Sequence, residues 1–285
     1  MRLGSTCLAR VAASGLWLAL PAPIADAADA PTPSGVLSSY EGVAPARTMQ
    51  TRALWRGDPA ALAGARTARI ATVEIAPGVA DKITTAQSAL VANELARTLC
   101  GRLSGHFRMV SRLAPADLTV RATITRIRTT NTVAATASLG ARVVARVVGS
   151  PVAPRVPIGL GGFSAEAETT DRSGVQRAAL VWTRDANFLL TGARASHIGD
   201  AYQLSAAFAN DMARLTITGL DPLREVTAPH VARKTPQAAC AVYGRGERSG
   251  YVNGMFGMAP EATDHDGPAP KPDAPRTKLP ARASR

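Results

Sequence analysis

Aromatic residues are scarce in this chain of 285 residues, because Phe, Trp and Tyr together make up only 4% of it. A core with so few rings must be built mainly from Ala, Val, Leu and Ile. The scarcity argues against an aromatic-lined pocket and against a surface on which nucleobases stack. We therefore expect no nucleic-acid partner.

Motifs for catalysis or metal binding are missing as well. No Gly-x-Ser-x-Gly motif occurs, and no histidine belongs to a His-Glu-x-x-His motif; the four are His106, His197, His230 and His265. The glycines from Gly159 to Gly162 precede an expected strand, whereas a phosphate-binding loop opens a helix. We expect no catalytic residue and no cofactor, and keep a hydrolase with an unrecognised site as a second alternative.

A metal site is not expected either. Asp264, His265 and Asp266 are adjacent and could hold a divalent cation, but only weakly in a flexible tail. A solvated charge cluster is the favoured interpretation.

Long hydrophobic runs are absent except near the N-terminus, where Val11 to Leu20 is too short to span a membrane. Arg2 and Arg10 supply the positive flank, and Ala25-Asp26-Ala27 resembles a cleavage site. This pattern predicts a signal peptide over residues 1–27, with cleavage after Ala27 favoured over Ala30, and an alternative of an ordinary buried helix. We expect a periplasmic or outer-envelope protein with no transmembrane helix and no lipid anchor.

Acidic residues are in the minority, since 33 Lys and Arg face 21 Asp and Glu for a net charge of +12. The excess, mostly arginine, indicates either an anionic partner or the amino-acid bias of the genome, and its even spread favours bias. Segment 131–162 contains arginines and no acidic residue. Its Arg142, Arg146 and Arg155 support an alternative function, binding of an anionic membrane surface or lipopolysaccharide.

Cysteine is rare, with three residues. Cys7 would leave with the signal peptide, which leaves Cys100 and Cys240 as an even pair in an oxidising compartment. They are candidates for a disulfide bond. The alternative is that Cys100 is simply a small hydrophobic residue on a buried helix face.

The clearest element runs from Ile83 to Asp117. Apolar residues recur every fourth position, at Val91, Leu95, Leu99 and Leu103, which predicts an amphipathic helix. Thr84-x-x-Gln87 fits a capping box at its start, and Gly105 suits a left-handed residue after its end, with Gly101 as the alternative. A short strand is expected over 106–111.

Alternating patterns predict strands over 67–76, 117–130, 163–168 and 178–183, the last two joined by a turn at Asp171–Gly174. A second helix is expected over 200–215. The fold class is α+β, with a single mostly antiparallel sheet, two helices on one face and the order β-α-β-β-loop-β-β-α. Glu166 and Glu168 would face solvent and pair with arginines such as Arg121.

The organisation follows from these elements. Residues 28–66 are predicted to be a linker or wrapping segment, in which 35–40 docks on the domain, and residues 67–218 are the α+β domain. Residues 219–285 are expected to be a largely disordered tail, because their Pro-, Ala- and charge-rich end buries little apolar surface.

Several short motifs occur in a characteristic order: Gly35-Val-Leu-Ser-Ser-Tyr40, Phe107-x-x-Val110, Ala114-Pro-Ala-Asp117, and Glu166-x-Glu168 with Asp171-x-x-Gly174. Over about residues 35–216 the chain resembles the bacterial family known as domain of unknown function 3313. The resemblance implies an exported envelope protein without established activity, often lipid-anchored, although this chain lacks the lipidated cysteine. We expect a non-catalytic cell-envelope protein that binds another, unidentified envelope protein.

Overall fold

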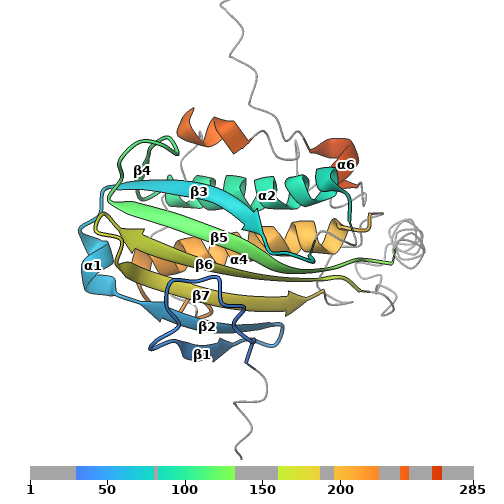
Figure 1. Ribbon diagram of the computed structural model, residues 1–285, viewed down its shortest axis with the longest axis horizontal. Helices are drawn as coiled ribbons and strands as arrows, with labels where there is room; N and C mark the ends of the chain where they lie inside the picture. The colour runs from blue at the N-terminus through green and yellow to red at the C-terminus, as the bar shows by residue number, and fades with distance from the viewer. Residues whose placement is uncertain are drawn as a thin grey trace, which may run out of the picture.

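One seven-stranded sheet forms the centre of the computed structural model (Figure 1), in the order β1-β2-β7-β6-β5-β3-β4. The structure describes residues 30–79, 83–131, 160–186, 196–224, 238–243 and 259–264. In chain order the elements are β1 (Ala44–Arg47), β2 (Thr51–Gly57), α1 (Pro59–Ala63), β3 (Thr67–Ile75), α2 (Thr85–Leu103), β4 (Arg108–Met109), β5 (Leu118–Arg128), β6 (Gly162–Asp171), β7 (Gln176–Asp185), α4 (Gly199–Thr218), the 3-10 helix η3 (Ala238–Tyr243) and α6 (Pro260–Thr263). The predicted signal peptide lies outside the described residues.

The sheet is mixed, whereas the sequence predicts a mostly antiparallel one. β3 pairs in parallel with β4 and with β5, while the pairs from β1 to β2, β2 to β7, β7 to β6 and β6 to β5 are antiparallel. The cause is α2, which follows β3. A helical crossover carries the chain back to the same end of the sheet, so the next strands run in the direction of β3.

Residues 28–66 are predicted to be a linker or wrapping segment, but β1, β2 and α1 within this range belong to the folded domain. β2 pairs with β7 along its whole length, from Thr51 opposite Arg184 to Gly57 opposite Ala178. α1 follows at once, capped by the Asp58 carboxylate, which accepts the backbone N–H of Ala61. The alternation in β2 is hard to recognise because Thr51 and Ala53 are small and Trp55 is only partly buried, and pairing with β7 stabilises the strand.

The two long helices, α2 and α4, lie side by side behind the sheet in Figure 1. The capping box of Thr84 and Gln87 is confirmed, and the predicted apolar stripe of α2 is buried. The predicted end just before Gly105 is confirmed, since α2 stops at Leu103 with Ser104 as its C-cap, but Gly105 is not left-handed as predicted. A left-handed glycine instead ends α4, where Gly219 has φ 69°.

The few aromatic residues are concentrated in the core between sheet and helices. Phe163 of β6, Trp182 of β7 and Phe208 of α4 are fully buried, with ring centroids 5.8 to 6.2 Å apart. The hairpin that carries the first two is confirmed, and Gly174 in its turn has φ 82°. The core is mainly aliphatic, as the composition predicts, and these three rings lie together within it.

Two described parts of the predicted disordered tail form short helices. Segments 238–243 and 259–264 pack against α2, and Cys240 and Tyr243 are buried. Local sequence does not show this, since the residues that hold these segments, such as Arg97, Cys100 and Tyr202, lie more than 60 positions away in the chain. None of the described helices has both the length and the apolar character needed to cross a membrane.

Candidate functional site

Glu166 and Glu168, the pair of carboxylates in β6, are each only 1% exposed. The prediction that they face solvent is wrong, because segment 34–40 covers them. The backbone N–H of Ser34 donates to Glu166 Oε1 (2.6 Å), and that of Ser38 donates to Glu168 Oε2 (2.9 Å). Docking of this segment, expected from its apolar and aromatic residues, is confirmed.

The side chains of the covering segment complete this contact. The Tyr40 hydroxyl donates to Glu166 and accepts the N–H groups of Gly35 and Leu37 at 2.9 and 3.1 Å. Gln176 donates its amide to Glu168 (2.8 Å) and to the carbonyl of Ser39. We call this arrangement the N-terminal clasp.

Electrostatics keep Glu168 charged. Burial by itself raises the pKa of Glu168, but hydrogen bonds from Ser38 and Gln176 and the charge of Arg121 together bring that pKa below its usual value. The predicted ion pair with Arg121 is present at 3.4 Å. A carboxylate held in its charged form by several donors binds a segment well and is a poor proton carrier.

The Glu168→Gln variant tests the clasp. We expect it to lower the free energy of unfolding by about 2 kcal/mol, because hydrogen bonds to a charged acceptor are replaced by weaker neutral ones. Hydrogen exchange of residues 34–40 should also become faster. Glu41→Gln, at an exposed residue beside the same segment, is the matched control, and equal behaviour of the two variants would contradict the assignment.

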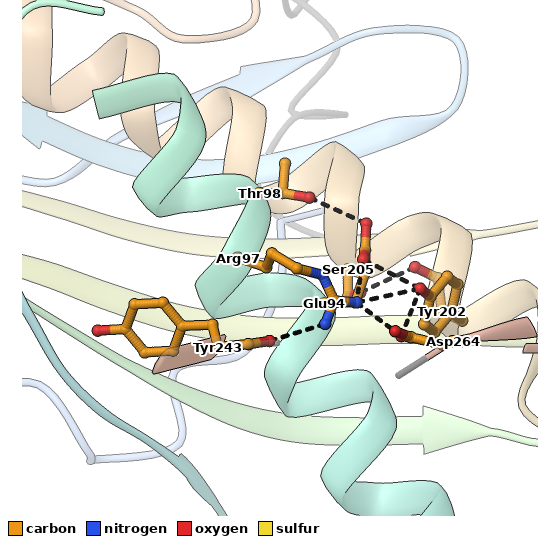
Figure 2. Close-up of polar contacts among 7 residues, drawn as sticks. All are labelled: Glu94, Arg97, Thr98, Tyr202, Ser205, Tyr243 and Asp264. Atoms are coloured by element: carbon orange, nitrogen blue, oxygen red, sulfur yellow. Dashed lines mark hydrogen bonds and ion pairs between the residues drawn. The ribbon is translucent and has the colours of Figure 1, made fainter. Parts of the chain in front are cut away.

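A second cluster of charged groups lies between α2, α4 and the C-terminal segment (Figure 2). Arg97 Nη2 lies 2.7 Å from Glu94 Oε2 and 2.6 Å from Asp264 Oδ2, and the Asp264 side chain is fully buried. The Tyr202 hydroxyl joins both acids, at 3.0 Å from Glu94 and 2.6 Å from Asp264. We call these four residues the helix-face cluster.

The helix-face cluster holds the C-terminal segment in place. Arg97 Nη1 also donates to the carbonyl of Tyr243 (2.8 Å), so one guanidinium binds both η3 and the end of α6. The expectation that Asp264 is part of a solvated charge cluster is wrong. The Asp264 side chain is buried, forms an ion pair with Arg97 and accepts a hydrogen bond from Tyr202. Its neighbours, His265 and Asp266, lie outside the described residues.

The pKa shifts favour fixed charges here too. Burial, and then the negative charges of Glu94 and Asp264, raise the pKa of Tyr202 far above its usual range, so the phenol stays neutral. Burial lowers the pKa of Arg97, but the same two acids outweigh it and raise that pKa. The neutral phenol of Tyr202 and the permanent cation of Arg97 therefore link the two acids in a structural role.

A disulfide bond joins Cys100 of α2 to Cys240 of η3, with 5.7 Å between their Cα atoms. Both residues are buried, so Cys100 is at once part of the apolar face of α2 and covalently linked. The bond lies one helical turn from Arg97. It fastens the same C-terminal segment that the helix-face cluster binds.

Asp211 of α4 is a largely buried acid, its side chain 17% exposed, that the sequence does not reveal. Trp182 Nε1 donates to its Oδ2 (2.9 Å), and Arg214 Nη1 lies 3.8 Å from its Oδ1. Burial raises the pKa of Asp211 to about 6, while the bond from Trp182 and the charges of Arg214 and Arg184 lower it in part. The only signal in the sequence is an acid on the polar edge of an amphipathic helix.

We expect Asp211→Asn to raise the free energy of unfolding by about 2 kcal/mol at pH 7, where the wild-type protein holds a poorly compensated charge. The pKa is about 6 in the folded protein and 3.8 in an unfolded reference. The aspartate therefore contributes its full stability below about pH 4 and loses it as the pH rises through 6.

Urea unfolding from pH 4 to pH 8 measures this difference. The gap between Asp211→Asn and wild type should open with rising pH, and Glu74→Gln, at an exposed position of β3, should show no such trend. A gap that does not change with pH would contradict the buried charge.

The structure keeps the other candidate residues apart. His106 and His197 are exposed at different places, and His230 lies outside the described residues, as do Arg142, Arg146 and Arg155. Gly161 and Gly162 lie where β6 begins, at a strand as expected. Within the described ranges, His, Cys, Asp and Glu do not gather into a group that could hold a metal ion.

Fold and sites together define a small α+β domain, in which a sheet backed by two helices binds the terminal segments of the chain through buried charged side chains. Residues 32–212 match the model of the protein family of unknown function DUF3313. The chain belongs to this family, which confirms the resemblance seen in the sequence.

Comparison with solved structures finds similar chains at low similarity. A PelC dodecamer from Paraburkholderia phytofirmans is 14% identical, with a TM-score of 0.30 and coverage of 61% of this chain and 96% of that one. A DUF4136 family protein from Bacteroides thetaiotaomicron is 10% identical, with a TM-score of 0.33 and coverage of 61% and 100%. No curated protein matches the chain.

Proposed function

We propose that this protein is a non-catalytic, exported component of the cell envelope that binds another envelope component. The disulfide bond between Cys100 and Cys240 carries the proposal. Disulfides persist in oxidising compartments and are rare in the cytosol, so the bond agrees with the signal peptide expected at residues 1–27.

The chemistry of the buried charges supports a binding role. In the N-terminal clasp and in the helix-face cluster, charged side chains are bonded to the chain's own terminal segments, as with Glu168 to Ser38 and Arg97 to Asp264. Groups engaged in this way stiffen a scaffold. A stiff scaffold suits a protein whose partner recognises a preformed surface.

We assign to the partner the face of the sheet away from the helices, outside the part that segment 34–40 covers, and call it the open face. α2 and α4 cover the opposite face, and on the open face Arg121 of β5 is 56% exposed, with Arg52 and Arg128 also exposed. The described edge strands suit a partner strand less well, because β1 has four residues, including Pro45, and β4 has two. We therefore expect side-chain contacts on the face.

Two measurements in the native host test the proposal. After cell fractionation, the full chain should be found in the envelope, and Cys100 and Cys240 should react with a maleimide only after reduction. A photo-crosslinking residue at position 121 should give a discrete adduct, whereas one at position 106, exposed beyond the end of α2, should not.

Reactive thiols in a cytosolic fraction would overturn the exported location. Absence of any adduct from positions 121 and 128 would overturn the assignment of the open face.

A further inference from the structure

A hollow of about 660 Å³ lies where the turn between β1 and β2 meets the end of β7. Arg47, Arg52 and Arg184 line it, together with the polar side chains of Thr48 and Gln50. Its volume is in the range of small-molecule sites. We propose that this hollow, which we call the arginine basin, binds the phosphate group of a ligand.

The charges around the arginine basin are mainly positive. The one acid in its lining, Asp185, lies 3.0 Å from Arg126 Nη2 and 3.3 Å from Arg128 Nη2, so two arginines of β5 neutralise it. The lining itself therefore carries three guanidinium groups, from Arg47, Arg52 and Arg184, and one carboxylate that is already paired. A concave site with such an excess attracts anions.

The hydrogen bonding of the Arg184 guanidinium is incomplete, and an anion would complete it. Its Nη2 donates to Gln50, but its Nε is buried and has no hydrogen-bond partner among the described residues. Burial lowers the pKa of Arg184, and Asp211 offsets this only in part. A buried guanidinium N–H without an acceptor is costly, and a turn of the Arg184 side chain toward the hollow that it lines would bring this N–H to a phosphate oxygen there.

The turn adds a hydroxyl donor. Thr48 Oγ1 accepts the backbone N–H groups of Gln50 (3.3 Å) and Thr51 (3.0 Å), which orients the side chain and leaves its own proton to donate. Planar guanidinium groups and a hydroxyl match the several oxygens of a phosphate monoester or diester better than a single carboxylate. The ligand class is therefore a phosphate ester.

The ester could be a soluble metabolite or a lipid headgroup, and Met49 distinguishes these sources. This side chain is fully exposed on the same turn, beside the arginines. An apolar residue next to phosphate-binding arginines would enter the acyl region of a bilayer if the phosphate belongs to a lipid. With a soluble ligand, the Met49 side chain would have no role in binding.

The experiment uses the purified, disulfide-intact chain with two probes: glycerol 3-phosphate, measured by calorimetry, and phosphatidylcholine vesicles with or without phosphatidylglycerol, measured by co-sedimentation. Arg52→Gln combined with Arg184→Gln should weaken binding about tenfold or more, because each removes a charge-assisted contact. Arg108→Gln, exposed in β4 at the other edge of the sheet, is the control for loss of charge alone and should change binding less than about twofold.

Each outcome decides the question. Binding of glycerol 3-phosphate that Met49→Ser leaves unchanged supports a soluble ester, and vesicle binding that needs phosphatidylglycerol and falls with Met49→Ser supports a lipid. Binding of neither probe, or an equal loss in the Arg108→Gln control, overturns the proposal.

Should the Arg184 variant not fold, Arg52→Gln alone, at an exposed position, provides the same test. The binding assays test phosphate esters and vesicles and not the envelope partner, so their failure leaves the proposed function standing, although Arg52 belongs to both surfaces.

Discussion

Replacing both Cys100 and Cys240 by alanine is expected to lower the free energy of unfolding by about 3 to 5 kcal/mol. The bond closes a loop between residues 140 positions apart, so its loss frees a large part of the unfolded chain. Alanine suits both positions because both side chains are buried and a serine hydroxyl would need a partner there. Urea unfolding monitored by circular dichroism measures the change.

Wild-type protein in a reducing agent provides the matched comparison, since it loses the bond and keeps the side chains. It should unfold at nearly the same urea concentration as the double variant. Hydrogen exchange in residues 238–243 should rise more than in α2, because η3 loses its covalent attachment while α2 keeps its core contacts. A double variant as stable as the oxidised wild type would show that the bond contributes nothing.

Replacing Arg97 by methionine is expected to cost about 3 to 5 kcal/mol, since it leaves Glu94 and Asp264 close together in a buried place without their cation. Methionine preserves the volume of the side chain and isolates the loss of charge.

Two further variants make this prediction specific. Arg102→Met, on the exposed side of the same helix, should change stability by less than about 0.5 kcal/mol. Adding Asp264→Asn to Arg97→Met should restore more than half of the loss, because the uncompensated charge is then removed. If the double variant were less stable than Arg97→Met alone, the ion pair would not be the reason for the effect.

The helix-face cluster shows why a sequence reveals one part of a site and hides another. Glu94 and Arg97 are three residues apart on one helix, so their contact follows from helical spacing. Tyr202 and Asp264 join them from 108 and 167 positions away. Nothing in the local pattern around Asp264, within a segment rich in Pro and Ala, distinguishes it from a solvated acid.

The N-terminal clasp gives the same lesson for a strand. Alternation correctly places Glu166 and Glu168 on one side of β6, away from the buried Ala165 and Ala167. It does not tell which other segment covers that side. Here the covering segment is 34–40, which contacts the strand from about 130 positions away in the sequence.

By itself, the sequence determined the elements with strong local periodicity: α2 with its capping box, the hairpin of β6 and β7, and the helix α4. Their hydrogen bonds and apolar faces depend on residues a few positions apart, and the spacing of side chains records them. Family membership was also visible there, in short motifs at fixed intervals.

Only the tertiary structure decided the parallel pairing of β3 and β5, the place of β2 beside β7, the bond from Cys100 to Cys240 and the burial of Glu168, Asp211 and Asp264. Each joins segments that are far apart in the chain, and whether a charged side chain is wet or buried depends on which distant segment covers it. Such contacts depend on the free energy of the whole fold, which no short stretch of sequence determines.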